Sequence, residues 1–176
     1  MRRIMVLGPC GSGKSTLAGE IARRLAIPVY HMDLLSWRSG WVEASKDEIA
    51  ASVEAIVSEP AWVIDGNDGA TLPQRLARAD TVLFLDYPIP LCFWRVLKRV
   101  ARWRGRPRPD MPEGCPERFD AGFMLYVARW NHGPRQRLEG YLRGHESKIV
   151  RLASPAAAEK WLDALPPHPE AARLTG

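Results

Sequence analysis

A glycine-rich segment near the beginning of the chain carries residue types that bind a polyphosphate. It fits the pattern of a glycine, any four residues, Gly-Lys and then Ser or Thr, and reads Gly8-Pro9-Cys10-Gly11-Ser12-Gly13-Lys14-Ser15. The glycines allow a tight turn in which backbone N–H groups point inward at phosphate oxygens. The amine of Lys14 has the reach for the β- and γ-phosphates, and the hydroxyl of Ser15 is a ligand for Mg²⁺. The segment predicts a nucleoside-triphosphate site and leaves open how the triphosphate is used.

The residues on either side of this segment predict the elements that must position it. An apolar run at residues 4–7 predicts a strand, and apolar residues recur at helical spacing from Leu17 to Leu25. A helix that begins near Gly13 would add the partial positive charge of its N-terminus to the phosphate site. We therefore expect the whole stretch from Gly8 to Thr16 to bind ATP. The competing interpretation is an ordinary glycine turn between a strand and a helix.

Three aspartates follow directly on further predicted strands. They are Asp33 after residues 29–31, Asp65 after residues 61–64 and Asp86 after residues 81–85. Open α/β sheets bind ligands outside the carboxyl ends of their strands, so all three are site candidates. Asp33 is interpreted as a Mg²⁺ ligand through water or as a carboxylate that binds the phosphate acceptor, with a helix N-cap as the alternative. Asp86 closes an apolar strand in the manner of a Walker B aspartate, and is a second candidate for contact with Mg²⁺ through water.

The region around Asp65 is the predicted binding site for the acceptor. Gly66 follows it and lets a ligand or another backbone segment come close. The residues expected to bind the acceptor are Asp33, Asp65, Gly66, Asn67 and Arg75. Trp37 and Trp41 flank a predicted loop, where they either shape the acceptor pocket or cap the core.

A basic segment lies between two predicted long helices. The first helix opens at Pro88 and Pro90 and carries a basic face, and arginines continue into a proline-rich loop at about residues 104–118. The second helix begins near Phe119. This composition predicts a mobile lid whose arginines neutralise charge during phosphoryl transfer. The candidates for that role are Arg99, Arg106 and Arg135, with solvated surface charges as the alternative.

The bulk composition limits the class of protein. With 176 residues, of which 46% are hydrophobic and 26% charged, we expect one globular domain at residues 1–165 and a frayed tail at 166–176. No apolar run approaches the ~20 residues of a membrane span, so we expect a cytoplasmic protein without a membrane partner. The net charge of +5 suits an anionic ligand. Strands and helices alternate, which predicts an α/β fold with a parallel sheet covered on both faces.

In the order of these signals the chain resembles adenylate-kinase-like P-loop kinases, and among them the DNA topology modulation proteins. The resemblance covers about residues 1–165. It rests on the phosphate loop, Tyr30-His31-Met32-Asp33, Trp37, Trp41, Trp62-Val63-Ile64-Asp65-Gly66-Asn67, Arg75, Ala79-Asp80, the run from Arg104 to Asp110, and Cys115-Pro116-Glu117.

The resemblance implies a P-loop NTPase fold of three layers, αβα, with a five-stranded parallel sheet and a helical lid insertion. It also implies ATP and Mg²⁺ as cofactors, and phosphoryl transfer to a small acceptor. Asp65-Gly66 resembles the Asp-Gly of nucleoside-monophosphate kinases, which continues there into Phe-Pro-Arg. Here it continues into Asn67-Asp68-Gly69, which argues against AMP as the acceptor.

The expected activity is that of an ATP-dependent kinase. The residues predicted to act in catalysis are Lys14, Asp33, Arg99, Arg106 and Arg135, with Mg²⁺ on Ser15. Nucleoside monophosphates, nucleosides, sugars and other small hydroxyl or phosphate compounds are the acceptors considered. One alternative is a nucleic-acid-binding or topology-modulating regulator that uses the basic run from Arg95 to Arg108, although no DNA-reading motif accompanies it. The other is an acceptor-free ATPase switch.

Overall fold

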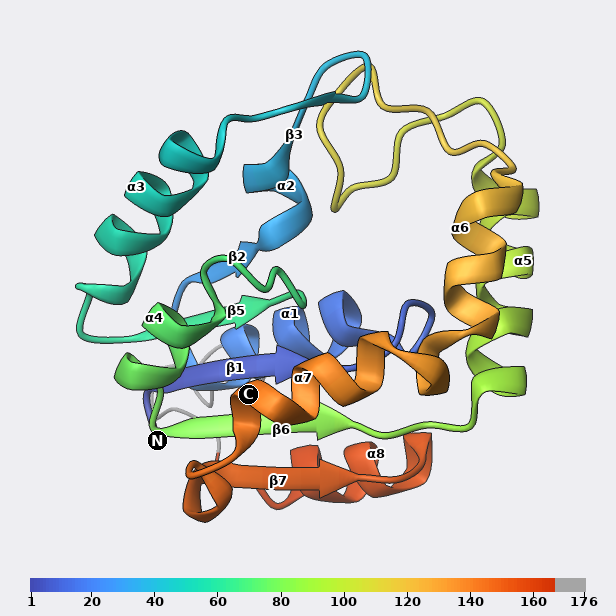
Figure 1. Ribbon diagram of the computed structural model, residues 1–176. Coiled ribbons are helices and arrows are strands. Elements are labelled where there is room, and N and C mark those ends of the chain that lie inside the picture. The colour runs from blue at the N-terminus through green and yellow to red at the C-terminus, as the bar shows by residue number, and fades with distance from the viewer. Residues whose placement is uncertain (167–176) are drawn as a thin grey trace, which may run out of the picture.

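A parallel sheet of five strands forms the centre of the molecule. The computed structural model describes residues 1–166, so the tail predicted at 166–176 lies, from residue 167 on, outside the described residues. The strands run in the order β2-β5-β1-β6-β7 (Figure 1). Their bounds are β1 (Arg3–Leu7), β2 (Val29–His31), β5 (Trp62–Asp65), β6 (Thr81–Leu85) and β7 (Ile149–Leu152). The predicted five-stranded parallel sheet is confirmed.

The register of the sheet brings the predicted site segments to one edge. On one side of β1, Val6 pairs with Asp65 of β5, and Asp65 in turn pairs with His31 of β2. On its other side, Leu7 pairs with Phe84 of β6. Because the strands are parallel, the segments that follow their carboxyl ends meet at the same edge. This edge is where open α/β sheets bind their ligands.

Helices cover both faces of the sheet, as expected for three layers (Figure 1). The helices α1 (Lys14–Leu25) and α8 (Pro155–Asp163) lie on one face, and α3 (Lys46–Val57), α4 (Leu72–Arg78) and α7 (Pro134–Leu142) on the other. The strands alternate between the two cores: on β1, Met5 packs in the cluster with α3, α4 and α7, while Ile4 packs in the cluster with α1 and α8. Burial on both faces explains why these strands are almost continuously apolar.

Two helices begin at side chains that satisfy their first N–H groups. At α3, the Ser45 hydroxyl accepts from the Glu48 amide at 3.3 Å, and the Glu48 carboxylate accepts from the Ser45 amide at 2.9 Å. At α8, the Ser154 hydroxyl accepts from the Ala157 amide at 3.2 Å, and Pro155 occupies the first helical position. Such caps each stabilise a helix by about 1 kcal/mol.

A helical arm stands at the carboxyl edge of the sheet. It consists of α5 (Ile89–Trp103), α6 (Ala121–Ala128) and the short 3-10 helix η1 (Trp130–His132). The predicted second helix begins later than Phe119, because the Asp120 carboxylate accepts from the Phe123 amide at 2.8 Å and caps α6. Phe119 lies before this cap and is 64% exposed. A second 3-10 helix, η2 (Glu146–Lys148), precedes β7.

The segment predicted as a loop with tryptophan walls is a small hairpin. After α2 (Met32–Ser36), the strands β3 (Trp37–Arg38) and β4 (Val42–Glu43) pair antiparallel. Gly40 and Trp41 form its turn with φ angles of +79° and +63°. The sequence pattern did not reveal the hairpin because each strand has only two residues.

The 104–118 loop docks against this hairpin from the opposite side of the site (Figure 1). The Gly40 amide donates to the Gly114 carbonyl at 3.0 Å, and the Trp41 indole donates to the Pro116 carbonyl at 3.2 Å. The Cys115 thiol donates to the Arg38 carbonyl at 3.1 Å. Two segments far apart in the sequence thus meet above the carboxyl ends of the strands.

Within residues 1–166, no helix combines the length and the apolar character that crossing a membrane requires.

A pair of glycine substitutions tests how tightly the phosphate loop is packed. A Cβ on Gly11 would lie 2.3 Å from the Cys92 carbonyl oxygen of α5, whereas a Cβ on Gly13 meets no described atom within 4 Å. Both positions have φ near +90°, +83° and +93°. Gly13→Ala should therefore cost only the left-handed strain, about 1–2 kcal/mol. Gly11→Ala should lower the free energy of unfolding by about 1–3 kcal/mol more. Urea denaturation of both variants checks this, and equal losses would contradict the packing.

Candidate active site

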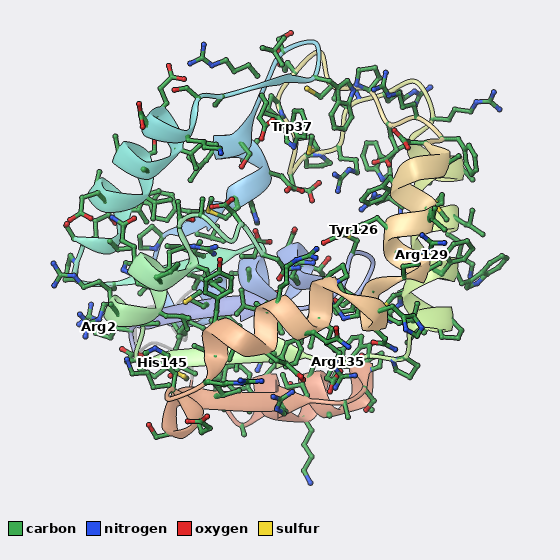
Figure 2. The ribbon with its side chains drawn as sticks, in the orientation of Figure 1. Arg2, Trp37, Tyr126, Arg129, Arg135 and His145 are labelled. Atoms are coloured by element: carbon green, nitrogen blue, oxygen red, sulfur yellow. The ribbon has the colours of Figure 1, made fainter. Side chains whose placement is uncertain are left out.

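A cavity of about 970 Å³ lies at the carboxyl edge of the sheet. Its floor is the glycine-rich segment and the start of α1. Its walls come from α2, the hairpin, the segment after β5 and the helical arm, and the 104–118 loop contributes Arg108, Asp110, Met111, Glu117 and Arg118. Figure 2 shows Trp37 and Tyr126 on opposite sides of this region. The cavity thus collects residues from nearly the whole length of the chain.

The phosphate loop is shaped by close backbone packing. A Cβ on Gly8 would lie 2.6 Å from the Leu85 carbonyl oxygen, and the φ of Gly8 is +141°. The side chain of Asn67, two residues after the end of β5, forms two hydrogen bonds with the backbone of Gly8. Its side-chain carbonyl accepts from the Gly8 amide at 3.0 Å, and its side-chain amide donates to the Gly8 carbonyl at 2.6 Å. The ends of β1 and β5 are therefore tied together where the loop begins.

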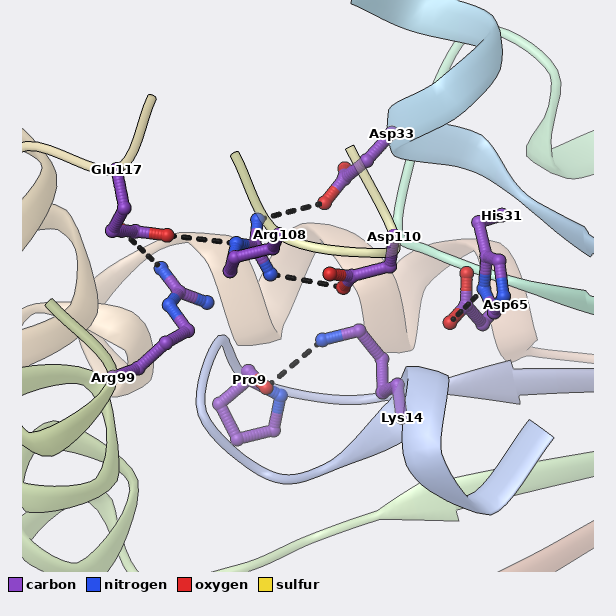
Figure 3. Close-up of polar contacts among 9 residues, drawn as sticks. All are labelled: Pro9, Lys14, His31, Asp33, Asp65, Arg99, Arg108, Asp110 and Glu117. Atoms are coloured by element: carbon purple, nitrogen blue, oxygen red, sulfur yellow. Dashed lines mark hydrogen bonds and ion pairs between the residues drawn. The ribbon is translucent and has the colours of Figure 1, made fainter. Parts of the chain in front are cut away.

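The floor of the cavity fits a polyphosphate. Gly13 is the N-cap of α1, and no side chain among the described residues caps this helix, so its first amides face the cavity without a capping oxygen. The Lys14 amine lies over the loop, where it donates to the carbonyls of Gly8 and Pro9 at 3.0 Å each (Figure 3). The Ser12 hydroxyl is buried without a partner within the described structure. Free donors at a helix N-terminus beside a lysine are what a phosphate chain requires. The residues that would hold Mg·ATP are Lys14, Ser15 and the loop amides.

The wall opposite Lys14 carries carboxylates (Figure 3). Asp33, in the first turn of α2, projects into the cavity, and its side chain is 57% exposed. Its pKa is raised because the cavity partly removes the carboxyl from water, an effect that the charges of Lys14 and Arg108 oppose. Asp65 is buried, and its carboxylate accepts a hydrogen bond from His31 Nδ1 at 3.0 Å. This hydrogen bond raises the pKa of His31, although burial of the ring opposes the shift.

A network of ion pairs spans the top of the cavity (Figure 3). Glu117, 6% exposed, contacts Arg99 of α5 at 3.3 Å and Arg108 of the 104–118 loop at 2.7 Å. Arg108 continues across the cavity to Asp110 at 2.9 Å and toward Asp33 at 4.0 Å. The two arginines are thus held by carboxylates directly above the phosphate loop.

Aromatic rings line both sides of the cavity. Trp37 and Trp41 pack edge to face with their ring centroids 5.5 Å apart. On the helical arm, the Arg99 guanidinium lies over the ring of Phe123, 5.6 Å from its centroid, and the ring of Tyr126 lies beside that of Phe123. These rings give the cavity flat apolar surfaces between its charged groups.

Most of the predicted site residues line this one cavity. These are Cys10, Gly11, Ser12, Gly13, Lys14, Ser15, Thr16, Asp33, Asp65, Gly66, Asn67 and Arg99. Gly8 and Pro9 are not among the described residues that line it, but their carbonyls hold the Lys14 amine.

Three other predicted residues lie away from the described cavity lining. Arg106 is exposed on the 104–118 loop. Arg135, at the start of α7, pairs with Asp86 at 2.7 Å, and Figure 2 places it beside β6 and β7. Asp86 also lies 3.8 Å from Arg151. Of the two aspartates expected to reach Mg²⁺ through water, Asp33 lines the cavity and Asp86 lies in this ion-pair cluster.

Within residues 1–166, no group of three or more His, Cys, Asp and Glu side chains is arranged to hold a metal ion.

Arg75 has a different position from the one expected of an acceptor-binding residue. It is 0% exposed and donates to the carbonyls of Gly66 at 2.9 Å and Asp68 at 2.7 Å. Burial lowers its pKa to about 10, and the charges of Asp68 and Asp65 oppose this shift. The guanidinium therefore holds the segment after β5 from behind, and does not reach the cavity within the described structure.

Among the site residues that sequence reasoning missed are His31, Arg108, Asp110 and Glu117. His31 lies beside Asp65 because β2 pairs with β5 in a register that aligns the two residues, and this pairing cannot be read from the sequence. Arg106 and Arg108 stand two residues apart, but only Arg108 lines the cavity, whereas Arg106 is exposed. The loop that carries both follows a turn at Gly105, which has a φ of +73° and a hydrogen bond of 2.8 Å from the Arg106 amide to the Trp103 carbonyl.

Comparison with known proteins supports the fold. Residues 4–86 match the family described as ATPases associated with various cellular activities (AAA). A comparison with curated proteins finds no match. The matched segment extends from β1 to the end of β6, and so includes the phosphate loop and the residues after β2 and β5.

Solved structures are similar over nearly the whole chain. Shikimate kinase from Acinetobacter baumannii in complex with shikimate has 15% identity and a TM-score of 0.59, over 93% of this chain and 92% of that one. A gluconokinase from Sinorhizobium meliloti 1021 has 19% identity and a TM-score of 0.54, over 92% and 94%. A shikimate kinase from Bacteroides thetaiotaomicron has 15% identity and a TM-score of 0.53, also over 92% and 94%. The chain has the α/β fold of P-loop NTPases, and kinases are among its structural neighbours. The finer resemblance to DNA topology modulation proteins stays a prediction.

The pairing of His31 with Asp65 predicts a pH-dependent contribution to stability. Because the pKa of His31 is raised in the folded protein, folding favours the protonated ring. The stabilisation is fully present below the unfolded pKa of roughly 6.5 and is lost as the pH rises through the higher folded pKa. His31→Gln should therefore lower the free energy of unfolding more at about pH 5.5 than at about pH 8.5. Denaturation series at both pH values, with exposed His132→Gln as the control, measure this, and an effect that grows with pH would contradict it.

Proposed function

We propose that the protein is an ATP-dependent phosphotransferase that moves the γ-phosphoryl group of Mg·ATP to a hydroxyl of a small acceptor. The observation that carries this proposal is the arrangement of Lys14 and Asp33. They lie on opposite sides of one cavity, and the pKa of Asp33 is raised by its partial removal from water, an effect that the charge of Lys14 partly offsets. The phosphate loop and a carboxylate suited to an acceptor therefore face each other.

Each side of the cavity has a role in this reaction. Lys14, Ser15 and the loop amides hold the triphosphate, and Mg²⁺ when bound adds positive charge beside the phosphates. Asp33 orients the acceptor hydroxyl and takes its proton as the oxygen attacks the γ-phosphorus and the bond to the β-phosphate oxygen breaks. The raised pKa of Asp33 makes it a better proton acceptor than an ordinary aspartate. The 104–118 loop, docked on the hairpin, covers the site and limits the access of water.

Arg99 and Arg108 are the cations best placed to neutralise charge in the transition state. Both are held by Glu117 and line the cavity. Arg106 and Arg135, proposed from the sequence for the same role, require a movement of the 104–118 loop or the loss of the Asp86 pair to reach the phosphates. A transition-state arginine contributes on the order of 10³–10⁵ in rate.

Two alternatives use parts of the same structure. An acceptor-free ATPase fits the match to AAA ATPases, but it leaves the carboxylate wall and the tryptophan pair without a role. A nucleic-acid-binding protein would use the basic run from Arg95 to Arg108. Three arginines of that run, Arg95, Arg99 and Arg108, line the cavity, which favours a small anionic ligand over a duplex.

Substitution of Lys14 tests the proposed site. Lys14→Ala should lower ATP-dependent phosphoryl transfer by about 10²–10³-fold or more, since it removes the charge that faces the phosphates. The fold should persist, as measured by circular dichroism and urea denaturation. Exposed Lys160→Ala on α8 is the matched control. Turnover like the wild type in Lys14→Ala would refute the site, and full-rate release of phosphate from ATP without any acceptor would favour the ATPase.

A second pair of variants separates the loop arginines. Arg108→Ala should reduce kcat by at least about 10²-fold, because its guanidinium lies over the phosphate loop, and should reduce ATP affinity less. Arg106→Ala, two residues away and exposed, should stay within about threefold of the wild type. Steady-state kinetics with calorimetry of Mg·ATP binding measures both effects. Equal losses in kcat and ATP affinity would make Arg108 a plain ligand contact, and a larger loss for Arg106 would return the role to that residue.

A further inference from the structure

The wall of the cavity opposite the phosphate loop has an unusual balance of charge. We call this wall the acceptor half, and its residues are Met32, Asp33, Trp37, Trp41, Asp65, Arg108 and Asp110. Among these described residues three are carboxylates and one is a cation. A second cation, Arg118, also lines the cavity; it is exposed and lies over the Trp41 ring, 5.8 Å from its centroid.

The cation of the acceptor half is already neutralised. The Arg108 guanidinium is 11% exposed and contacts Glu117 at 2.7 Å, Asp110 at 2.9 Å and Asp33 at 4.0 Å. Figure 3 shows these carboxylates on different sides of the guanidinium. An acceptor with a phosphate or carboxylate group would have to displace one of them to reach Arg108. It would then lie beside Asp33, Asp65 and Asp110, and like charges placed together in a binding site repel each other and weaken binding.

The same groups suit a ligand that donates hydrogen bonds. An ionised carboxylate is only an acceptor, so its oxygens favour O–H and N–H groups. Trp37 and Trp41 add flat apolar surface beside these oxygens, on which the face of a ring packs. We infer that the acceptor is an uncharged polyhydroxylated ring compound, such as a nucleoside or a sugar, that carries neither a phosphate nor a carboxylate. This inference rests on the proposed function, since it concerns the second substrate of the same site.

Matched pairs of acceptors test the inference. Each pair has a neutral member and its anionic counterpart: adenosine and adenosine 5′-monophosphate, thymidine and thymidine 5′-monophosphate, glucose and gluconate. Binding is measured by calorimetry on the wild-type protein with a non-hydrolysable Mg·ATP analogue, and transfer is measured with radiolabelled ATP. The neutral member of at least one pair should bind and be phosphorylated, with its anionic counterpart at least about tenfold weaker. Activity with nucleosides or with sugars distinguishes the two kinds of ring.

Two results would overturn the inference. One is an anionic member that binds as well as its neutral counterpart or better, and the other is a failure of every neutral member to bind. Binding of the Mg·ATP analogue is measured in the same experiment without acceptor. If the analogue does not bind, the proposed function fails; if it binds and an anionic acceptor is preferred, only the inference on acceptor charge fails.

Substitution of Asp110 tests the cause of the discrimination. Asp110→Asn removes one of the carboxylates that hold Arg108, so an anionic acceptor gains a partly free guanidinium and loses a like charge. The preference for the neutral member should fall at least about threefold. Glu113→Gln removes an exposed carboxylate of the same loop, outside the described cavity lining, and should leave the preference unchanged. An unchanged preference in Asp110→Asn, or an equal fall in both variants, would refute the role of the carboxylate cluster.

Discussion

The pair of hydrogen bonds between the Asn67 side chain and the Gly8 backbone fixes the geometry from which the rest of the site follows. One amide side chain satisfies both backbone groups of Gly8, at 3.0 and 2.6 Å, and so joins the ends of two adjacent strands. Behind it, the buried Arg75 holds the carbonyls of the same segment. A buried polar group left without its partner costs about 1–3 kcal/mol, so loss of either support would loosen the start of the phosphate loop. The anion site is thus shaped by a neighbouring strand as well as by its own glycines.

Above this rigid floor, the structure is held by charge. Glu117 connects Arg99 of the helical arm to Arg108 of the 104–118 loop, and Arg108 extends further to Asp110 of its own loop and toward Asp33 of α2. These ion pairs depend on the charge of both partners, whereas the floor is held by close backbone packing and uncharged hydrogen bonds. The hairpin and the loop that meet above the network do so through three uncharged hydrogen bonds. The site therefore combines a floor shaped by close backbone packing with a cover held by ion pairs and a few hydrogen bonds.

The sequence predicted the fold and the floor of the site well, and the cover poorly. The phosphate loop depends on glycines whose conformations are set locally, so Gly8 to Ser15 could be assigned from residue types alone. The carboxyl ends of parallel strands necessarily meet, which explains why Asp33 and Asp65 were found. Arg108 and Glu117 could not be identified as site residues from the sequence. Their positions depend on a turn at Gly105 and on an isolated β-bridge between residues 104 and 117, and neither feature produces a periodic pattern in the sequence. The sequence suggested that Arg75 binds the acceptor, because arginine is a common residue for binding anions. Its complete burial and its hydrogen bonds to the Gly66 and Asp68 carbonyls show that it supports the backbone after β5.

Gly66 has a further consequence for the reaction. A Cβ at this position would lie 2.6 Å from the Cβ of Met32, and the φ of Gly66 is +110°. Met32 begins α2, and Asp33 is the next residue. A side chain at residue 66 would therefore displace Met32 and, with it, the start of α2. In the proposed reaction, the absence of that side chain lets Asp33 stand as close to the phosphate loop as it does.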